Sequence, residues 1–184
     1  MTFLHQKQKQ LEKLDKSHVG AWDKKIVSLC NKLNRSKKYY TTSSCAGRII
    51  LIKSSETKEP NLFVYRTHEK TDFHELKHAL VNAKKKREVV FQQEPCILHV
   101  ACKDLESAQQ IVDKAKFAGW KRSGIMATRK RFICELMSTE HLELPIIKDK
   151  KILVDDDFLK ILVEQANAKL ERTWNKISKL DALV

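Results

Sequence analysis

Glycine is scarce in this sequence, and its few copies stand alone. Only four occur among the 184 residues, at positions 20, 47, 119 and 124. A dinucleotide-binding turn of the G-x-G-x-x-G type, or a phosphate-binding loop of the Walker type, needs several glycines within a few residues. The sequence therefore argues against a Rossmann-type cofactor site, and any cofactor must be held by another kind of segment.

Cysteine pairs and long apolar runs are missing as well. The five cysteines are odd in number and include no C-x-x-C pair, so neither a zinc ribbon nor a disulfide framework is indicated. Four of them lie among apolar neighbours and are expected in the core, whereas Cys45 does not. No apolar run approaches the roughly 20 residues of a membrane span, and the N-terminus has no signal-peptide pattern. We therefore expect a soluble, cytoplasmic protein with no membrane partner.

Negative charge is in short supply relative to positive charge. The chain has 36 lysines and arginines against 23 acidic residues, a formal net charge of +13. Such an excess usually meets a polyanion, and nucleic acid is the leading candidate, although a solvated lysine-rich surface would look the same. The length suits one hydrophobic core, so we expect a single domain over residues 1–184.

The spacing of apolar residues predicts a mixture of helices and strands. Helices are expected at 3–16, 21–34, 72–87 and 105–119, with a long one after Asp155; strands are expected at 48–54, 61–68, 88–93 and 96–102, with one or two more within 121–138. The first two strands should form a hairpin. This order predicts an α+β fold, a single domain with a mixed, mostly antiparallel sheet flanked by helices.

The stretch TTSSCAGR, residues 41–48, gathers small polar side chains before an apolar run. It lacks helical periodicity, so we expect a loop. Its hydroxyls and backbone N–H groups could hold a carboxylate or phosphate, with Gly47 allowing close approach and Arg48 clamping the anion. A turn whose serines and threonines bond their own backbone is the alternative. Taken alone, the stretch favours the turn.

The stretch HELKH, residues 74–78, matches the H-E-x-x-H pattern on an expected helix. Two histidines four residues apart could bind zinc while Glu75 polarises water, which would indicate a zinc hydrolase. However, Lys77 places a cation inside the pattern, and no third ligand has a recognisable context downstream. We therefore interpret it as a solvated helix face and expect no metal site.

Several short blocks gain meaning from their order in the chain. These are T-x-SSC-x-GR, LFVYRTH, and P-x-ILHV followed by DLESAQQIVDKAKFAGWKRSGI. In this order they closely resemble the tRNA wybutosine-synthesizing protein 3 family, from about Asp15 to Asn167. The chain departs from the family where Thr41, Phe63 and Trp120 replace serine, tryptophan and phenylalanine. These changes keep the hydroxyl or the ring.

The resemblance implies an α+β fold that is not a Rossmann methyltransferase fold. It also implies methyl transfer from S-adenosylmethionine to a ring nitrogen, N4, of the tricyclic wyosine-type guanine derivative 3′ of the anticodon in phenylalanine tRNA. The family's motif residues, expected to bind cofactor or substrate, fall on Ser43, Ser44, Cys45, Gly47, Arg48, Ser123 and Gly124, with Pro95 between blocks. His99 and His68 would be the candidate catalytic bases. Whether the serines hold the cofactor's carboxylate or a tRNA phosphate stays open.

Basic clusters would supply the grip on the tRNA backbone. They are Lys84, Lys85, Lys86 and Arg87, then Lys121 and Arg122, then Arg129, Lys130 and Arg131. A non-catalytic RNA-binding module is the main alternative; it would bind tRNA without any affinity for the cofactor. No protein partner is inferred.

Overall fold

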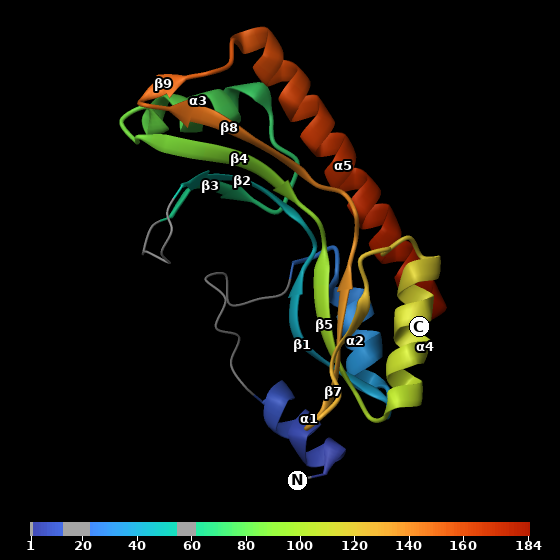
Figure 1. Cartoon of the computed structure of the whole chain (residues 1–184). Coiled ribbons are helices and arrows are strands. Elements are labelled where there is room, and N and C mark those ends of the chain that lie inside the picture. The colour runs from blue at the N-terminus through green and yellow to red at the C-terminus, as the bar shows by residue number, and fades with distance from the viewer. Residues whose placement is uncertain (1, 13–22, 55–61) are drawn as a thin grey trace. The chain divides into compact units, whose positions relative to one another are not determined.

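The computed structural model describes residues 2–12, 23–54 and 62–184, and the chain divides into two compact units (Figure 1). Unit 1 contains Met1–Ala46, Cys96–Thr139 and Trp174–Val184; unit 2 contains Gly47–Pro95 and Glu140–Thr173. The chain therefore passes from one unit to the other after residues 46, 95, 139 and 173, and helix α5 (Asp156–Leu183) contributes to both. A single domain over 1–184 stays a prediction.

Unit 1 is built on a four-stranded sheet in the order β1-β5-β7-β6, in which every neighbouring pair is antiparallel. Its strands are β1 (Tyr39–Cys45), β5 (Ile97–Cys102), β6 (Gly124–Ala127) and β7 (Phe132–Met137). Its helices are α1 (Phe3–Leu11), α2 (Val27–Arg35) and α4 (Leu105–Phe117), with the end of α5. Figure 1 shows α2 and α4 alongside this sheet.

The core of unit 1 lies between one face of the sheet and these helices. Side chains alternate along a strand, so Leu98 and Val100 of β5 enter the core together with Leu136 of β7. Trp120 is fully buried, and its indole N–H donates to the Lys176 carbonyl at 3.0 Å. The opposite face of the sheet is left for polar side chains.

Unit 2 contains a five-stranded antiparallel sheet in the order β3-β2-β4-β8-β9. Its strands are β2 (Arg48–Lys53), β3 (Phe63–Thr67), β4 (Glu88–Glu94), β8 (Leu142–Lys148) and β9 (Lys151–Ile152), accompanied by α3 (Phe73–Ala83). The pairing of β2 with β3 confirms the expected hairpin, whose connection lies outside the described residues.

Local signals placed several boundaries correctly. Asp72 and Asp104 cap α3 and α4 by accepting hydrogen bonds from Glu75 N at 2.9 Å and Ser107 N at 2.8 Å. The α4 segment then stops at Gly119, which adopts a φ of +96°. Asp155 accepts from Phe158 N at 2.8 Å at the start of α5. The four cysteines expected in the core are buried, and Cys45 is half-buried.

Other boundaries were wrong. The expected loop at TTSSCAGR is mostly strand β1, because threonine suits a strand and because alternate hydroxyls can lie on its half-solvated face. Helix α3 ends at Ala83, and the KKKR stretch forms the turn before β4. The expected first two helices are shorter than 3–16 and 21–34, although residues 13–22 lie outside the described part of the chain.

The α+β class with antiparallel sheets is confirmed, and the strands form two sheets rather than one. Strands β8 and β9 were not expected, because Pro145 interrupts the apolar run of β8. The proline is tolerated where the pairing register with β4 shifts, opposite Val90. Among the described residues, no helix is both long and apolar enough to cross a membrane.

Candidate active site

A row of polar residues runs across the sheet of unit 1. Ser43 of β1 lies opposite His99 of β5, His99 lies opposite Glu135 of β7, and Glu135 lies opposite Gly124 of β6. Three of these four positions are motif residues that lie far apart in the sequence. Strand register therefore brings Ser43, His99 and Gly124 together, as the family motif requires.

The row lies on the sheet face that does not contact α2 and α4. Leu98 and Val100 point into the core, so the side chain of His99 between them points the other way. We call this the open face of unit 1; its members include Ser43, His99 and Glu135. The side chains of His99 and Glu135 are each 30% exposed, so the row is reachable from solvent.

Hydrogen bonds join the first three members of the row. Ser43 Oγ lies 2.6 Å from His99 Nδ1, and His99 Nε2 lies 2.9 Å from Glu135 Oε2. An ionised carboxylate only accepts hydrogen bonds, so in the neutral imidazole the hydrogen is on Nε2 and Nδ1 is an acceptor. The Ser43 hydroxyl then donates to Nδ1. The three groups form a serine–histidine–carboxylate chain that can accept a proton at the serine oxygen.

Glu135 was not among the residues expected from the sequence. The segment RFICELMS carries it as the only acid in an otherwise apolar strand. Ile133, Glu135 and Met137 alternate with the buried Cys134 and Leu136, so a period-2 reading of β7 would have placed the acid on the solvated face. Pairing of β7 with β5, however, cannot be read from either strand alone.

Ser44 and Cys45 differ from Ser43 in where they point. Ser44 forms a side-chain hydrogen bond with Cys30 of α2, on the core side of β1. Burial raises the pKa of the Cys30 thiol to about 11, and the hydrogen bond from Ser44 opposes that rise. Cys45, two residues after Ser43, is half-buried opposite Ile97. Of the two serines, only Ser43 contacts the histidine.

Ser123 has a structural task in the turn after α4. Its hydroxyl donates to the Trp120 carbonyl at 2.6 Å and accepts from Met137 N at 3.2 Å, and the residue is buried. Gly124 is different, because a Cβ added there would have no neighbour within 4 Å. The space beside Glu135 at the end of the row is therefore open.

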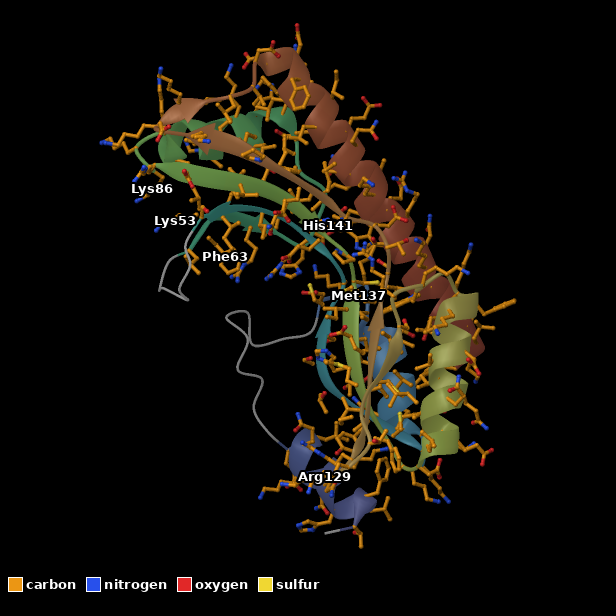
Figure 2. The ribbon with its side chains drawn as sticks, viewed as in Figure 1. Lys53, Phe63, Lys86, Arg129, Met137 and His141 are labelled. Carbon is orange, nitrogen blue, oxygen red and sulfur yellow. The ribbon has the colours of Figure 1, made fainter. Side chains whose placement is uncertain are left out.

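The other motif residues lie in unit 2. Arg48 of β2 forms an ion pair with Glu94 of β4, and its guanidinium lies 5.1 Å from the centre of the Phe63 ring. Arg66 lies 5.2 Å from the same ring, which is exposed (Figure 2). His68 is half-buried just after β3.

Gly47 has its own structural reason. Its φ is +92°, and an added Cβ would lie only 3.1 Å from both the Glu94 carbonyl oxygen and Leu170 Cδ1. Both the backbone conformation and the close packing therefore demand glycine at this position, whether or not a ligand approaches it.

The basic clusters are exposed. Lys84, Lys85, Lys86 and Arg87 form the turn between α3 and β4, Lys121 and Arg122 follow α4, and Arg129, Lys130 and Arg131 connect β6 to β7 (Figure 2). Arg87 makes one ion pair, at 3.6 Å from Asp149. The other members are available to an anionic partner.

The HELKH segment lies on α3 with both histidines and Glu75 exposed, which confirms the solvated helix face. Glu75 accepts a hydrogen bond from the Thr71 hydroxyl at 3.1 Å. Lys77 forms an ion pair with Asp156 and lies 5.3 Å from the centre of the Phe73 ring. Each of these contacts suits a helix surface.

Comparisons with known proteins agree on one family. A family model described as Methyltransferase TYW3 matches residues 5–184. A protein of Methanocaldococcus jannaschii named tRNA(Phe) 7-((3-amino-3-carboxypropyl)-4-demethylwyosine(37)-N(4))-methyltransferase is 38% identical, with 94% of this chain and 91% of that protein covered. A tRNA wybutosine-synthesizing protein 3 homolog of Xenopus laevis is 35% identical over 96% of this chain and 72% of its own length. A solved structure from Pyrococcus horikoshii is similar with a TM-score of 0.88 and 30% identity, covering 99% of this chain and 95% of that one.

Proposed function

The chain belongs to the Methyltransferase TYW3 family, and from that premise we propose that the Ser43–His99–Glu135 row takes up the proton released during methyl transfer to tRNA. The enzyme is a tRNA methyltransferase. Its acceptor is N4 of the 4-demethylwyosine-type base of phenylalanine tRNA, as the names of its relatives from Methanocaldococcus jannaschii and Thermococcus kodakarensis state for those proteins. Action on tRNA also suits the cytoplasmic location expected from the sequence.

The reaction needs a proton acceptor. A bond forms between N4 and the methyl carbon, the carbon–sulfur bond of the donor breaks, and the N4 proton must leave. A sulfonium methyl donor such as S-adenosylmethionine supplies an electrophilic methyl group and needs no activation by the protein. The tasks left to the side chains are positioning, exclusion of water and proton removal.

The Ser43 hydroxyl is the terminal group of the row and the one that would touch the acceptor. As Ser43 Oγ receives the N4 proton, its own proton passes to His99 Nδ1 along the 2.6 Å hydrogen bond. The carboxylate of Glu135 stabilises the imidazolium that results and fixes its tautomer at 2.9 Å. The single observation that carries this proposal is the pair of hydrogen bonds converging on His99.

The open face also fits S-adenosylmethionine by its chemistry. The carboxylate of Glu135 is opposite in charge to a sulfonium and an α-amino group, and the space beside Gly124 is open. Ser43, Cys45 and Gly124 are therefore the motif residues that would hold the donor. Ser44 and Ser123 would support them through their contacts with Cys30 and Trp120.

The phosphates of the tRNA would be held by the exposed basic turns, since each arginine or lysine that contacts a phosphate releases condensed counterions. Lys84, Lys85, Lys86 and Arg87 serve unit 2, and Lys121, Arg122, Arg129, Lys130 and Arg131 serve unit 1. Arg48, held by Glu94 and Phe63, adds a cation next to an exposed ring on which a base can stack. His68 remains a second candidate base.

Adjacent serines on opposite faces of β1 provide the test. Ser43→Ala removes the proton-accepting hydroxyl and should lower the rate of methyl transfer on the order of 10²-fold, the usual range for general base catalysis. Ser44→Ala makes the same chemical change on the core side, and its rate should stay close to wild type. Single-turnover assays with S-adenosylmethionine and phenylalanine tRNA carrying the demethylated base measure the rate.

The comparison of the two variants decides the outcome. Equal losses in Ser43→Ala and Ser44→Ala would mean that the strand is merely sensitive to substitution. A Ser43→Ala variant with the wild-type single-turnover rate would remove the row from the chemistry. Melting temperatures of both variants, measured in parallel, show whether either has lost its fold.

A further inference from the structure

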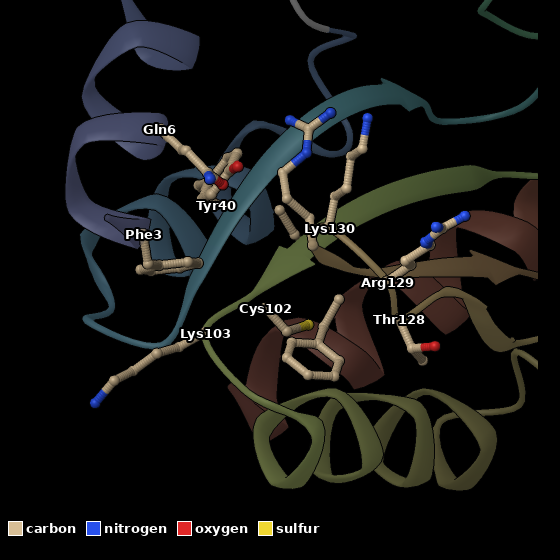
Figure 3. A pocket seen from close by; sticks show the side chains of 11 residues that line it. Phe3, Gln6, Tyr40, Cys102, Lys103, Thr128, Arg129 and Lys130 are labelled. Atoms are coloured by element: carbon tan, nitrogen blue, oxygen red, sulfur yellow. The ribbon is translucent and has the colours of Figure 1, made fainter. Parts of the chain in front are cut away.

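A pocket of about 240 Å³ lies in unit 1, outside the Ser43–His99–Glu135 row (Figure 3). Its apolar lining consists of aromatic rings from three elements: Phe3 of α1, Tyr40 of β1 and Phe132 of β7. The rings of Phe3 and Tyr40 are 5.3 Å apart and tilted by 49°. Rings arranged in this way offer a surface against which a planar group can pack.

Tyr40 has an unused polar group in this lining. The residue is fully buried, and its hydroxyl has no hydrogen-bond partner among the described residues. A buried hydroxyl without a partner is costly, and a phenylalanine would fill the same space without that cost. The hydroxyl is explained if a ligand supplies the missing partner.

The remaining polar lining is strongly positive. Lys103 follows β5, and Arg129, Lys130 and Arg131 come from the connection between β6 and β7, as Figure 3 shows for the labelled residues. No acidic residue is among the described residues that line the pocket. The ligand is therefore an anion with a planar part.

We propose that this pocket binds one nucleotide of the RNA substrate, with its base against the rings, its phosphate at Arg129–Arg131 and a polar edge on the Tyr40 hydroxyl. Base stacking on aromatic side chains and phosphate contacts from arginine and lysine are the usual means of holding single-stranded RNA. S-adenosylmethionine fits poorly, because its sulfonium would meet four cations and because the pocket is smaller than a typical site for a ligand of that size.

The pocket lies next to the row. Tyr40 pairs with Ala101 and Ala101 with Ile133, whereas His99 lies two residues earlier on β5. Two residues of a strand span roughly 7 Å, and residues two apart share a face. A nucleotide in the pocket would therefore hold the loop of the RNA beside the reacting base. This inference rests on the proposed function only in taking RNA as the substrate.

The sharpest test removes one oxygen atom. Tyr40→Phe should weaken binding of an unmodified anticodon stem-loop of phenylalanine tRNA about three- to tenfold, the worth of one hydrogen bond. Because the hydroxyl has no partner in the protein, the melting temperature should stay the same or rise. A tyrosine with a purely structural role would instead lower the melting temperature and leave RNA affinity unchanged.

Charge variants test the phosphate contact. The double variant Arg129→Gln/Lys130→Gln should lower the salt dependence of stem-loop binding by about two in slope, one for each phosphate contact. Its matched control is Lys116→Gln/Lys179→Gln, which removes the same charge from exposed positions on α4 and α5. Equal slopes in the two double variants would overturn the proposal.

Two further results separate this proposal from the methyl transfer chemistry. At saturating RNA, Tyr40→Phe should keep the wild-type single-turnover rate, whereas Ser43→Ala should not. Competition for the stem-loop by inorganic phosphate, as effective as that by a nucleoside monophosphate, would identify a simple anion site and refute the nucleotide pocket. RNA affinity is measured without the methyl donor, so failure of the proton-transfer proposal would leave this test intact.

Discussion

Two polar contacts cross between strands at nearby points in the chain, one in each unit, and they differ in kind. In unit 1 the side chains of Ser43, His99 and Glu135 form a hydrogen-bonded chain whose central group can gain and lose a proton. In unit 2 the guanidinium of Arg48 pairs with Glu94 and lies against the Phe63 ring. A guanidinium stays charged at every pH at which proteins are folded, so this second contact cannot move a proton.

The difference separates chemistry from binding within one chain. Proton transfer belongs to the histidine row of unit 1, whereas the arginine of unit 2 can attract an anion and its aromatic neighbour can stack on a base. Loss of the row should therefore act on the rate of reaction. Loss of the arginine should act on the affinity for RNA, and the following variants test this distinction.

The largest effect is expected from His99→Asn. Asparagine keeps a polar side chain but cannot take up a proton, so single-turnover methyl transfer should fall about 10²- to 10⁴-fold. Affinity for the anticodon stem-loop should be unchanged, since no charge is lost from the basic turns. His78→Asn, on the exposed face of α3, is the matched control and should react at the wild-type rate. A parallel fall in RNA affinity would erase the distinction between the two units.

Arg48→Lys should have an intermediate effect. Lysine keeps the charge but cannot both pair with Glu94 and lie flat against Phe63, so RNA affinity should fall about three- to tenfold. The loss should be the same at all pH values, because neither cation titrates in the working range. Arg172→Lys alters an ion pair with Glu140 that has no aromatic neighbour among the described contacts, and its affinity should not change. A change in reaction rate at saturating RNA would contradict a pure binding role.

The lysines of the turn before β4 should contribute mainly through salt dependence. Replacing Lys84, Lys85 and Lys86 with glutamine should lower the slope of log affinity against log salt by about one per phosphate contact. A triple variant at Lys116, Lys160 and Lys179 removes the same charge from the helices. If both triple variants flatten the slope equally, net charge rather than this turn explains the binding.

The smallest effect is expected from Glu75→Gln. Glutamine retains an oxygen that can accept the hydrogen bond from Thr71, and the helix face is exposed, so methyl transfer and melting temperature should match wild type. Metal analysis of the purified variant and wild type should find no stoichiometric zinc. A joint loss of zinc and activity would place the chemistry at HELKH and overturn the role of the row.

Signals that depend on neighbouring residues were read correctly from the sequence. The caps at Asp72 and Asp104, the stop at Gly119 and the β2–β3 hairpin each rest on a few adjacent residues. The same holds for the burial of four cysteines within apolar stretches. Local propensity and periodicity act over one or two turns of helix or one strand, which is the range over which these predictions hold.

The histidine row could be predicted only in part. The resemblance supplied Ser43 and His99, but their hydrogen bond joins residues 56 apart in sequence, and the bond from His99 to Glu135 spans 36. Such contacts depend on which strands pair and in which register, and no local pattern encodes that. The strand nature of TTSSC was missed for a related reason, because β1 becomes a strand through its pairing with β5.

The way helix α5 is shared by both units governs how the protein can be made during translation. Ile177 and Leu180 belong to the core of unit 1, yet they follow every strand of both sheets in the chain. The sheet of unit 1 is therefore synthesised long before its own core can close, and its apolar face must wait until these residues have left the ribosome. A nascent chain stopped at Thr173 would have all nine strands and would still expose that face, which makes premature termination a route to aggregation rather than to a smaller working enzyme.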